Sequence, residues 1–303
     1  MLSTHRLSSP AFLMSPPTTE ECKLSRDYLK LILGHTIMSC IYGTDVAVER
    51  ALRVSLCAWS AITESARPES FYELIRSMFP PLSNLSAYQG SGVPSGAIPL
   101  FLPAGTLEAP VYHASDLYLS AFYIVDVFAS DHTRFIPSPL FIPYQPRSSL
   151  RCRDILEWVN PIPLWFFGEG GILGVPIKGA NGIKLVHGLE DSIGEPITTL
   201  KIKFGWPNYK PDEKQIRGST KLPLNNLSRL ASLTANAVCE YMSSKTKKVK
   251  LNNSVPQRWA IGTGAGEISS ADVVLLGVVF VSTRAVMPLL AVRDEFIFAT
   301  DTI

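Results

Sequence analysis

The sequence has few of the residues that metal proteins and secreted proteins depend on. Its 303 residues include five cysteines and five histidines, and charged residues make up 18%. The cysteines are odd in number and widely scattered, so neither a disulfide framework nor a zinc site is indicated. They are Cys22, Cys40, Cys57, Cys152 and Cys239. We expect buried thiols in a reducing compartment, cytoplasmic or nuclear, with no metal and no cofactor.

A long uninterrupted apolar run is also missing. The best membrane candidate, 273–292, starts with an apolar stretch that is then broken by Arg284 and Pro288. Because a spanning helix needs about 20 apolar residues, we expect no membrane association. The β-branched content of this segment favours a buried strand, a turn and a second strand instead. Residues 1–20 lack the apolar core of a secretory signal, and their Ser and Pro content predicts a disordered leader. Because acids are absent before Glu20, a transit peptide is an alternative interpretation of this segment.

No complete catalytic motif is present. Gly168, Gly170 and Gly174 follow an apolar segment, but Leu173 stands where a dinucleotide fingerprint requires its third glycine. The residues that follow, among them Pro176 and Gly179, disfavour the helix that a phosphate site would need, so we expect a hairpin or bulge between strands. The glycine-rich stretch 262–266 has no Walker lysine and leads into a strand, which predicts a flexible turn.

The histidines are isolated from one another in the sequence. Only His113, three residues before Asp116, and His132, directly after Asp131, have a carboxylate nearby. Each could form half of an acid–base pair, but catalysis needs a second positioned group. An enzyme is therefore an alternative that requires His113 or His132 to meet a carboxylate in an enclosed pocket. The other histidines are His5, His35 and His187.

What the sequence does contain indicates an α+β fold with a helical N-terminal region at 21–81. An apolar stripe starts at Ser25 and ends at Gly43, which is suited to terminate a helix. Thr44 or Asp45 caps a second helix. Pro68 can open a third, which Pro80 and Pro81 stop.

The middle of the chain, 82–196, predicts strands and loops. The segment from Pro80 to Pro176 holds 13 of the 23 prolines, and proline excludes helix interiors. Within it, 115–128 is apolar enough for a strand or a short helix, 154–159 favours a brief helix, and 82–110 reads as a long loop or linker.

The C-terminal region, 197–303, is expected to be a strand–turn–helix–strand module. Four apolar residues, Leu200, Ile202, Phe204 and Trp206, alternate with polar ones, as in a half-buried strand. Pro207-Asn208 then suits a turn with positive φ at Asn208. Asn225 can cap a helix that runs to about 243, after which 258–261 forms a short strand and a final strand pair starts at 272.

This module carries most of the positive charge. From Lys201 to Arg258 there are 12 Lys and Arg residues against three acids, about +9, whereas the whole chain is only +2. Such asymmetry predicts a polyanionic or acidic partner. The candidate binding residues are Lys201, Lys203, Lys210, Lys214, Arg217, Lys221, Lys245, Lys247, Lys248 and Lys250.

Three functions follow from this charge and from the missing motifs. The favoured one is a protein-interaction or structural role in which the basic module docks an acidic protein surface. The second is nucleic-acid binding, because Trp206 and Tyr209 lie among the basic residues and aromatic stacking holds single strands. Against it, Trp206 shares a strand face with Phe204, which predicts a core position. An enzyme of unidentified class is the third.

The same region resembles a C-terminal module of uncharacterised proteins from mushroom-forming (basidiomycete) fungi. Their turn usually reads Trp-Pro-Gly-Tyr, whereas 206–209 reads Trp-Pro-Asn-Tyr; their helix opens Pro-Ile-Thr-Arg, whereas 223–226 reads Pro-Leu-Asn-Asn. Both differences preserve the local conformation, since Gly and Asn both accept positive φ in the turn and Thr and Asn both cap helices. The resemblance covers roughly 197–293. It implies an intracellular, basidiomycete-type protein and brings no known activity and no catalytic residues.

Overall fold

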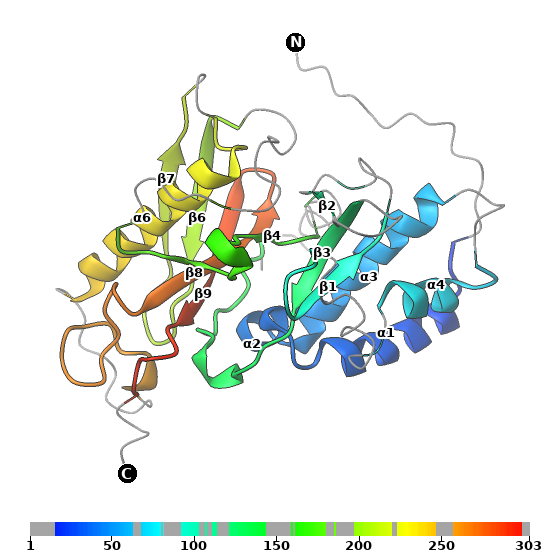
Figure 1. Cartoon of the computed structure of the whole chain (residues 1–303), viewed down its shortest axis with the longest axis horizontal. Helices are drawn as coiled ribbons and strands as arrows, with labels where there is room; N and C mark the ends of the chain where they lie inside the picture. The colour runs from blue at the N-terminus through cyan, green and yellow to red at the C-terminus, as the bar shows by residue number, and fades with distance from the viewer. Residues whose placement is uncertain are drawn as a thin grey trace.

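A computed structural model describes most of the chain and shows an α+β protein, as the sequence predicts. Figure 1 shows the N-terminal helices and a small sheet in one half of the molecule, and a large sheet covered by a helix in the other half. The described residues are 16–62, 68–79, 81, 92–102, 107, 111–113, 121–143, 159, 161–179, 185, 197–219, 223–246 and 257–298.

The helical region consists of α1 (Thr19–Leu33), α2 (Ile37–Tyr42), α3 (Thr44–Ala61) and α4 (Phe71–Met78). The expected first helix is in fact two, since the chain breaks after Leu33 and restarts at Ile37. Gly43, with φ of 93°, ends α2 as predicted. It is also the N-cap residue of α3, with no side-chain cap, so the predicted cap at Thr44 or Asp45 is wrong.

Two helix starts differ from the prediction because of local capping. α1 begins earlier than Ser25, at a capping box in which Thr18 Oγ1 accepts the Glu21 N–H at 3.2 Å and Glu21 accepts the Thr18 N–H at 2.9 Å. This start also places the end of the proposed leader inside a helix. α4 begins after Ser70, whose Oγ accepts the Glu73 N–H at 3.1 Å, and Pro68 lies before it.

A small antiparallel sheet packs beside these helices. Its order is β1 (Ala97–Leu100), β3 (Ala121–Val127) and β2 (Tyr112–His113). β3 settles the choice left open for 115–128 in favour of a strand, and β1 lies in the segment expected to be a loop. The brief helix predicted at 154–159 lies almost wholly outside the described residues.

The large sheet is built around a long hairpin of β8 (Val273–Ser282) and β9 (Ala285–Val292). The strand–turn–strand prediction for the apolar C-terminal segment is therefore confirmed. The order is β4-β8-β9-β6-β7, β5 also pairs with β8, and all neighbours are antiparallel except β6 and β9. The other strands are β4 (Leu164–Trp165), β5 (Val175–Pro176), β6 (Thr199–Phe204) and β7 (Asp212–Arg217).

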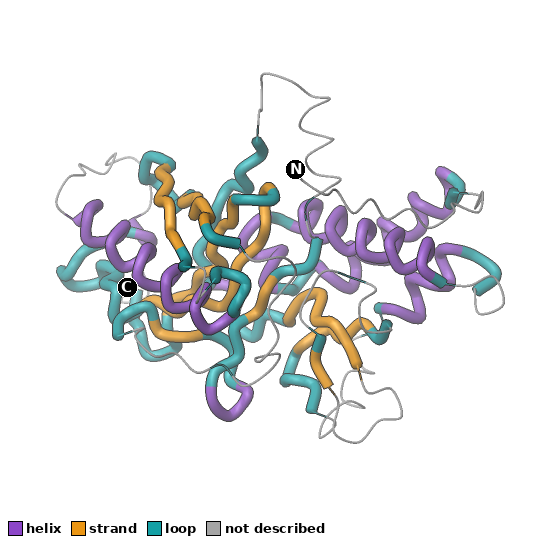
Figure 2. Tube along the Cα trace, turned by 90° about the horizontal axis from the view of Figure 1, so that it is seen from above, coloured by secondary structure: helices purple, strands orange, loops and turns teal. Residues whose placement is uncertain are grey.

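The β8–β9 hairpin is buried on both faces. Every residue of β9 is buried. Val286 and Leu290 join the core beneath α6 (Leu227–Thr246), whereas Met287 and Leu289 join the core of the N-terminal helices. Figures 1 and 2 agree that α6 and these helices lie on opposite sides of the strands. No helix in the described ranges has both the length and the apolar content to span a bilayer.

The two glycine-rich segments are turns. Phe167 and Leu173 form an antiparallel bridge between β4 and β5. The chain between them is therefore the predicted hairpin. At 262–266, Glu267 closes the turn by accepting the Gly264 N–H at 2.8 Å. The prediction of a strand at 258–261 is wrong for its first residues, because Gln257–Trp259 forms a 3-10 helix. Within 258–261, Ile261 forms an isolated β-bridge, with Ile268.

Candidate binding surface

The alternation along β6 separates its apolar and basic side chains. Leu200, Ile202 and Phe204 are buried in the core beneath α6, whereas Lys201 is exposed and Lys203 is partly exposed on the opposite face. This arrangement confirms the predicted half-buried strand. The two lysines therefore lie on the face that points away from α6.

The partner of β6 is β7, a strand that the sequence pattern does not predict. Only Ile216 of β7 is buried, so the strand lacks the apolar alternation by which half-buried strands are recognised. β7 nevertheless pairs along its whole length with β6. Among the described residues it is the last strand of the sheet, and Figure 1 shows it at the outer edge beside α6.

The register of this pair collects basic residues from both strands. Thr199 lies opposite Arg217, Lys201 opposite Gln215, and Lys203 opposite Glu213. Side chains directly opposite in an antiparallel pair share a face. We call the face formed by Thr199, Lys201, Lys203, Glu213, Gln215 and Arg217 the outer face of the β6–β7 pair.

Glu213 is the carboxylate at the centre of the outer face. It accepts Nζ of Lys201 at 2.9 Å and also the ammonium group of Lys203. Hydrogen bonds from Lys203 and then Lys201 lower the pKa of Glu213 to about 2. Lys203 Nζ also lies 4.3 Å from the ring centre of Phe141, which is 37% exposed. Two lysines thus share one acid, and one of them borders an exposed aromatic ring, while Arg217 lies farther along β7 on the same face.

Two other predicted binding residues lie on the helix side of the same sheet. Lys214 pairs with Glu240 of α6, and Lys245 Nζ lies 3.1 Å from Asp212. The acid Glu213 thus pairs with lysines on the outer face, whereas Asp212 and Glu240 pair with lysines on the helix side. Lys214 and Lys245 tie α6 to β7 and do not belong to the outer face.

The remaining predicted residues do not join the outer face either. Lys210 is exposed in the turn between β6 and β7. Four lysines of the prediction, Lys221, Lys247, Lys248 and Lys250, lie outside the described residues. The structure therefore groups Lys201, Lys203 and Arg217, and places Lys210, Lys214 and Lys245 elsewhere.

Comparison with protein-family models, curated proteins and solved structures finds no match. The function must then be argued from the chain's own geometry.

The aromatic residues among the basic ones are part of the core. Trp206 is 4% exposed and Tyr209 is 7% exposed. Trp206 donates its indole N–H to the Trp259 carbonyl oxygen at 2.8 Å, and the Tyr209 hydroxyl accepts the Ile261 N–H at 2.8 Å. Asn208 between them has φ of 66°, so the predicted turn is confirmed. Neither ring is available for a nucleobase to stack on.

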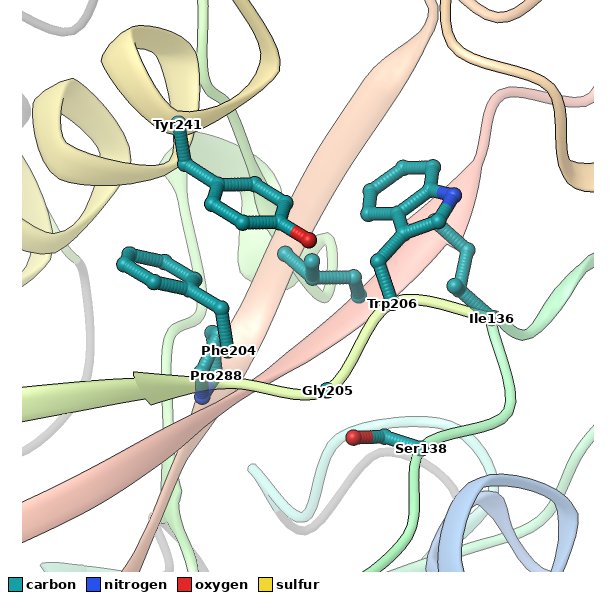
Figure 3. Close-up of a pocket in the computed structure, with 8 residues that line it drawn as sticks. Ile136, Ser138, Phe204, Gly205, Trp206, Tyr241 and Pro288 are labelled. Carbon is teal, nitrogen blue, oxygen red and sulfur yellow. The ribbon is translucent and has the colours of Figure 1, made fainter. Parts of the chain in front are cut away.

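A small cavity lies on the helix side of this turn (Figure 3). It leaves about 20 Å³ for the centre of a water-sized molecule, enough for one water. The Tyr241 hydroxyl is buried there with no hydrogen-bond partner among the described residues, and burial raises the pKa of Tyr241. The cavity is far too small for an organic substrate. Its lining is Ile136, Ser138, Phe204, Gly205, Trp206, Tyr241, Pro288 and Leu290.

Of the two histidines that the enzyme alternative names, only His132 can be examined in the described part of the structure, and it does not meet a carboxylate in an enclosed pocket. His132 is exposed, and the neighbouring Asp131 carboxylate accepts Thr133 N at 2.9 Å and Arg134 Nε at 3.1 Å. The side chain of His113 lies outside the described part of the structure. His132 instead contacts the ring of His35, a neighbour that sequence spacing gives no means of finding.

Proposed function

We propose that the protein is a non-catalytic binding protein whose outer face docks an acidic surface of a protein partner. The observation that carries this proposal is the exposed outer face itself, where Lys201 and Lys203 share Glu213 and Arg217 lies farther along the same face. Basic groups in this arrangement attract acidic surfaces and raise association rates. Phe141 at the border adds an aromatic contact of the kind enriched at interfaces.

A protein partner is favoured over a nucleic acid by the position of the aromatic residues. Single-stranded nucleic acids are held by stacking on exposed rings as well as by phosphate contacts. Trp206 and Tyr209 are buried and hydrogen-bonded, so the outer face offers charge without these stacking rings. Phe141 is the exposed ring beside it, and Lys203 already covers part of that ring.

Site-specific photo-cross-linking tests the proposal. A photoreactive residue at Gln215, an exposed position on the outer face, should yield polypeptide adducts in extracts of the source cells. The double variant Lys201→Glu/Arg217→Glu should abolish those adducts because it reverses the charge of the face. Lys178→Glu is the matched control, since Lys178 is exposed and lies just after β5. Adducts that persist in the double variant would contradict the proposal.

Nucleic-acid binding remains a second candidate through charge alone. It predicts retention on an oligonucleotide resin with a steep salt dependence. Elution below about 50 mM salt would exclude it, because phosphate-binding proteins hold well at such low ionic strength. Gln215 adducts that nuclease removes would instead support it and count against a protein partner.

We also propose that 197–293 is the module of the fungal proteins that the sequence resembles, and that the protein works in the cytoplasm or nucleus. The Asn208 turn supports the first point. Free thiols at Cys22, Cys40, Cys57 and Cys239 support the second. Imaging of a fluorescent fusion tests the compartment, and an alignment of homologues that includes the turn and the helix start tests the module.

A further inference from the structure

Two histidines from separate segments meet on the surface. His35 lies between α1 and α2, and His132 opens the 3-10 helix His132–Arg134. Their ring centres are 5.1 Å apart with an angle of 42° between the ring planes. Both residues are exposed, so the contact is not a by-product of core packing.

The backbone on both sides of this pair is fixed. The His35 carbonyl oxygen accepts Ala129 N at 2.9 Å, and Thr36 forms an antiparallel bridge with Phe128. On the other side, Asp131 caps the 3-10 helix by accepting Thr133 N at 2.9 Å. The Thr133 carbonyl oxygen in turn accepts Arg258 at 2.9 Å. A pair held in this way is preorganised, as a ligand site requires.

The ring separation matches that of two imidazoles on one metal ion. Zinc binds imidazole nitrogen at about 2.0–2.1 Å, which places the ion about 3.2 Å from each ring centre. At a tetrahedral angle, two such ring centres are about 5 Å apart. The observed 5.1 Å agrees with this value, and the ring planes, tilted by 42°, are neither stacked nor edge-to-face.

No third ligand from the described residues joins the two imidazoles. Within the described residues, no group of three or more His, Cys, Asp or Glu side chains could hold a metal. The Asp131 carboxylate is engaged by Thr133 and Arg134, and this ion pair offsets the charge of Arg134. The remaining coordination positions would be open to water or to a ligand from another molecule.

We propose that His35 and His132 form a surface site for a divalent transition-metal ion, of which Zn²⁺ is the ion to test. Imidazole is a preferred ligand for this class of metal. The ion would connect the α1–α2 junction to the segment that carries His132. Because it binds the folded state, it would raise the unfolding temperature once the free zinc concentration exceeds the dissociation constant, and further as that concentration increases.

Zinc titration of the full chain, followed by calorimetry, tests the site. His35→Gln and His132→Gln should each weaken zinc binding by about tenfold or more, since each removes one of two ligands. Both side chains are exposed, so the unfolding temperature in EDTA should stay at the wild-type value. Cys57→Ser, which removes an exposed thiol, is the control and should bind as the wild type does.

The alternative outcomes are distinct. The site is overturned if the wild type takes up no zinc at about 1 mM, which would leave the two rings as a simple aromatic contact. It is also overturned if zinc binding survives in the double variant His35→Gln/His132→Gln, or disappears in Cys57→Ser. Zinc-dependent stabilisation that both single histidine variants lose would support it.

Discussion

The indole N–H of Trp206 donates to the backbone carbonyl oxygen of Trp259 at 2.8 Å. Beside it, the Tyr209 hydroxyl accepts the Ile261 N–H. Both aromatic side chains of the β6–β7 turn thus hold the segment that follows α6 in the sequence. Their role is structural, and this separates the core of the module from its basic surface.

Trp206→Phe should therefore lower stability without weakening partner binding. The variant loses the hydrogen bond to Trp259 and part of the buried ring, which together cost about 1–3 kcal/mol. Urea unfolding measures the change in the free energy of unfolding. Retained cross-linking from Gln215 is the companion measurement. A stable Trp206→Phe that no longer cross-links would contradict this role.

Glu213→Gln should strengthen docking. The change releases Lys201 and Lys203 from their shared carboxylate and adds one positive charge to the outer face. Retention of the purified protein on an acidic polypeptide resin should then extend to higher salt. Because the pairs are exposed, the free energy of unfolding should change by less than about 1 kcal/mol.

Glu240→Gln is the matched control for that prediction. It makes the same change in net charge but releases Lys214 on the helix side of the sheet. If the outer face is the docking surface, Glu240→Gln should shift elution less than Glu213→Gln does. Equal shifts would mean that net charge alone controls retention.

Asp126 should make stability depend on pH in a direction opposite to that of most carboxylates. It is 2% exposed, and burial raises the pKa of Asp126 to about 7. Its Oδ1 accepts Val127 N at 2.8 Å and Met38 N at 3.3 Å, so it joins β3 to α2. The folded chain keeps a proton on Asp126 between about pH 4 and 7, where the unfolded chain has lost it.

The contribution of this proton is present below about pH 4 and is lost as the pH rises through 7. In the window between, stability should fall by up to about 1.4 kcal/mol per pH unit in the wild type. Asp126→Asn keeps an acceptor oxygen and should remove this slope. Urea unfolding from pH 5.5 to 8 checks it, and parallel profiles for the two proteins would show that Asp126 does not titrate there.

Gly205→Ala should destabilise the protein through Ser138. A Cβ at Gly205 would lie 2.5 Å from Ser138 Oγ and 3.2 Å from Pro139 Cδ. Overpacking of this kind costs about 1–3 kcal/mol. Ser138→Ala removes the nearer atom, so the double variant should recover part of the loss, as a double-mutant cycle of unfolding free energies can measure. Simple additivity would show that the clash is relieved elsewhere.

Local patterns in the sequence predicted much of the fold. The helix expected to run to about 243 is α6, and Leu227, Ala231 and Val238 on one of its faces are buried. The helix cap was off by one residue, since Asn226 Oδ1 and not Asn225 accepts Arg229 N at 2.9 Å. Two adjacent asparagines have equal capping propensity, so only the backbone geometry decides between them.

The missed features depend on long-range pairing. β7 is held by charge pairs across to β6 and α6, such as Lys203 with Glu213, and these do not produce an apolar period. The split of the basic residues between two faces follows from that same pairing. His35 and His132 meet where the link between α1 and α2 is joined to the end of β3 by the bridge between Thr36 and Phe128, a long-range contact that no local sequence pattern predicts.

The burial of β8–β9 on both faces has a consequence for synthesis. Helices α1–α4 emerge from the ribosome long before the hairpin that completes their core, because β8 starts only at Val273. Until then the nascent chain exposes the apolar faces that later contact Met287 and Leu289. We expect a nascent chain stalled before β8 to be protease-sensitive in its helical region and to bind chaperones. The C-terminal hairpin thus sets the moment at which the N-terminal half can fold.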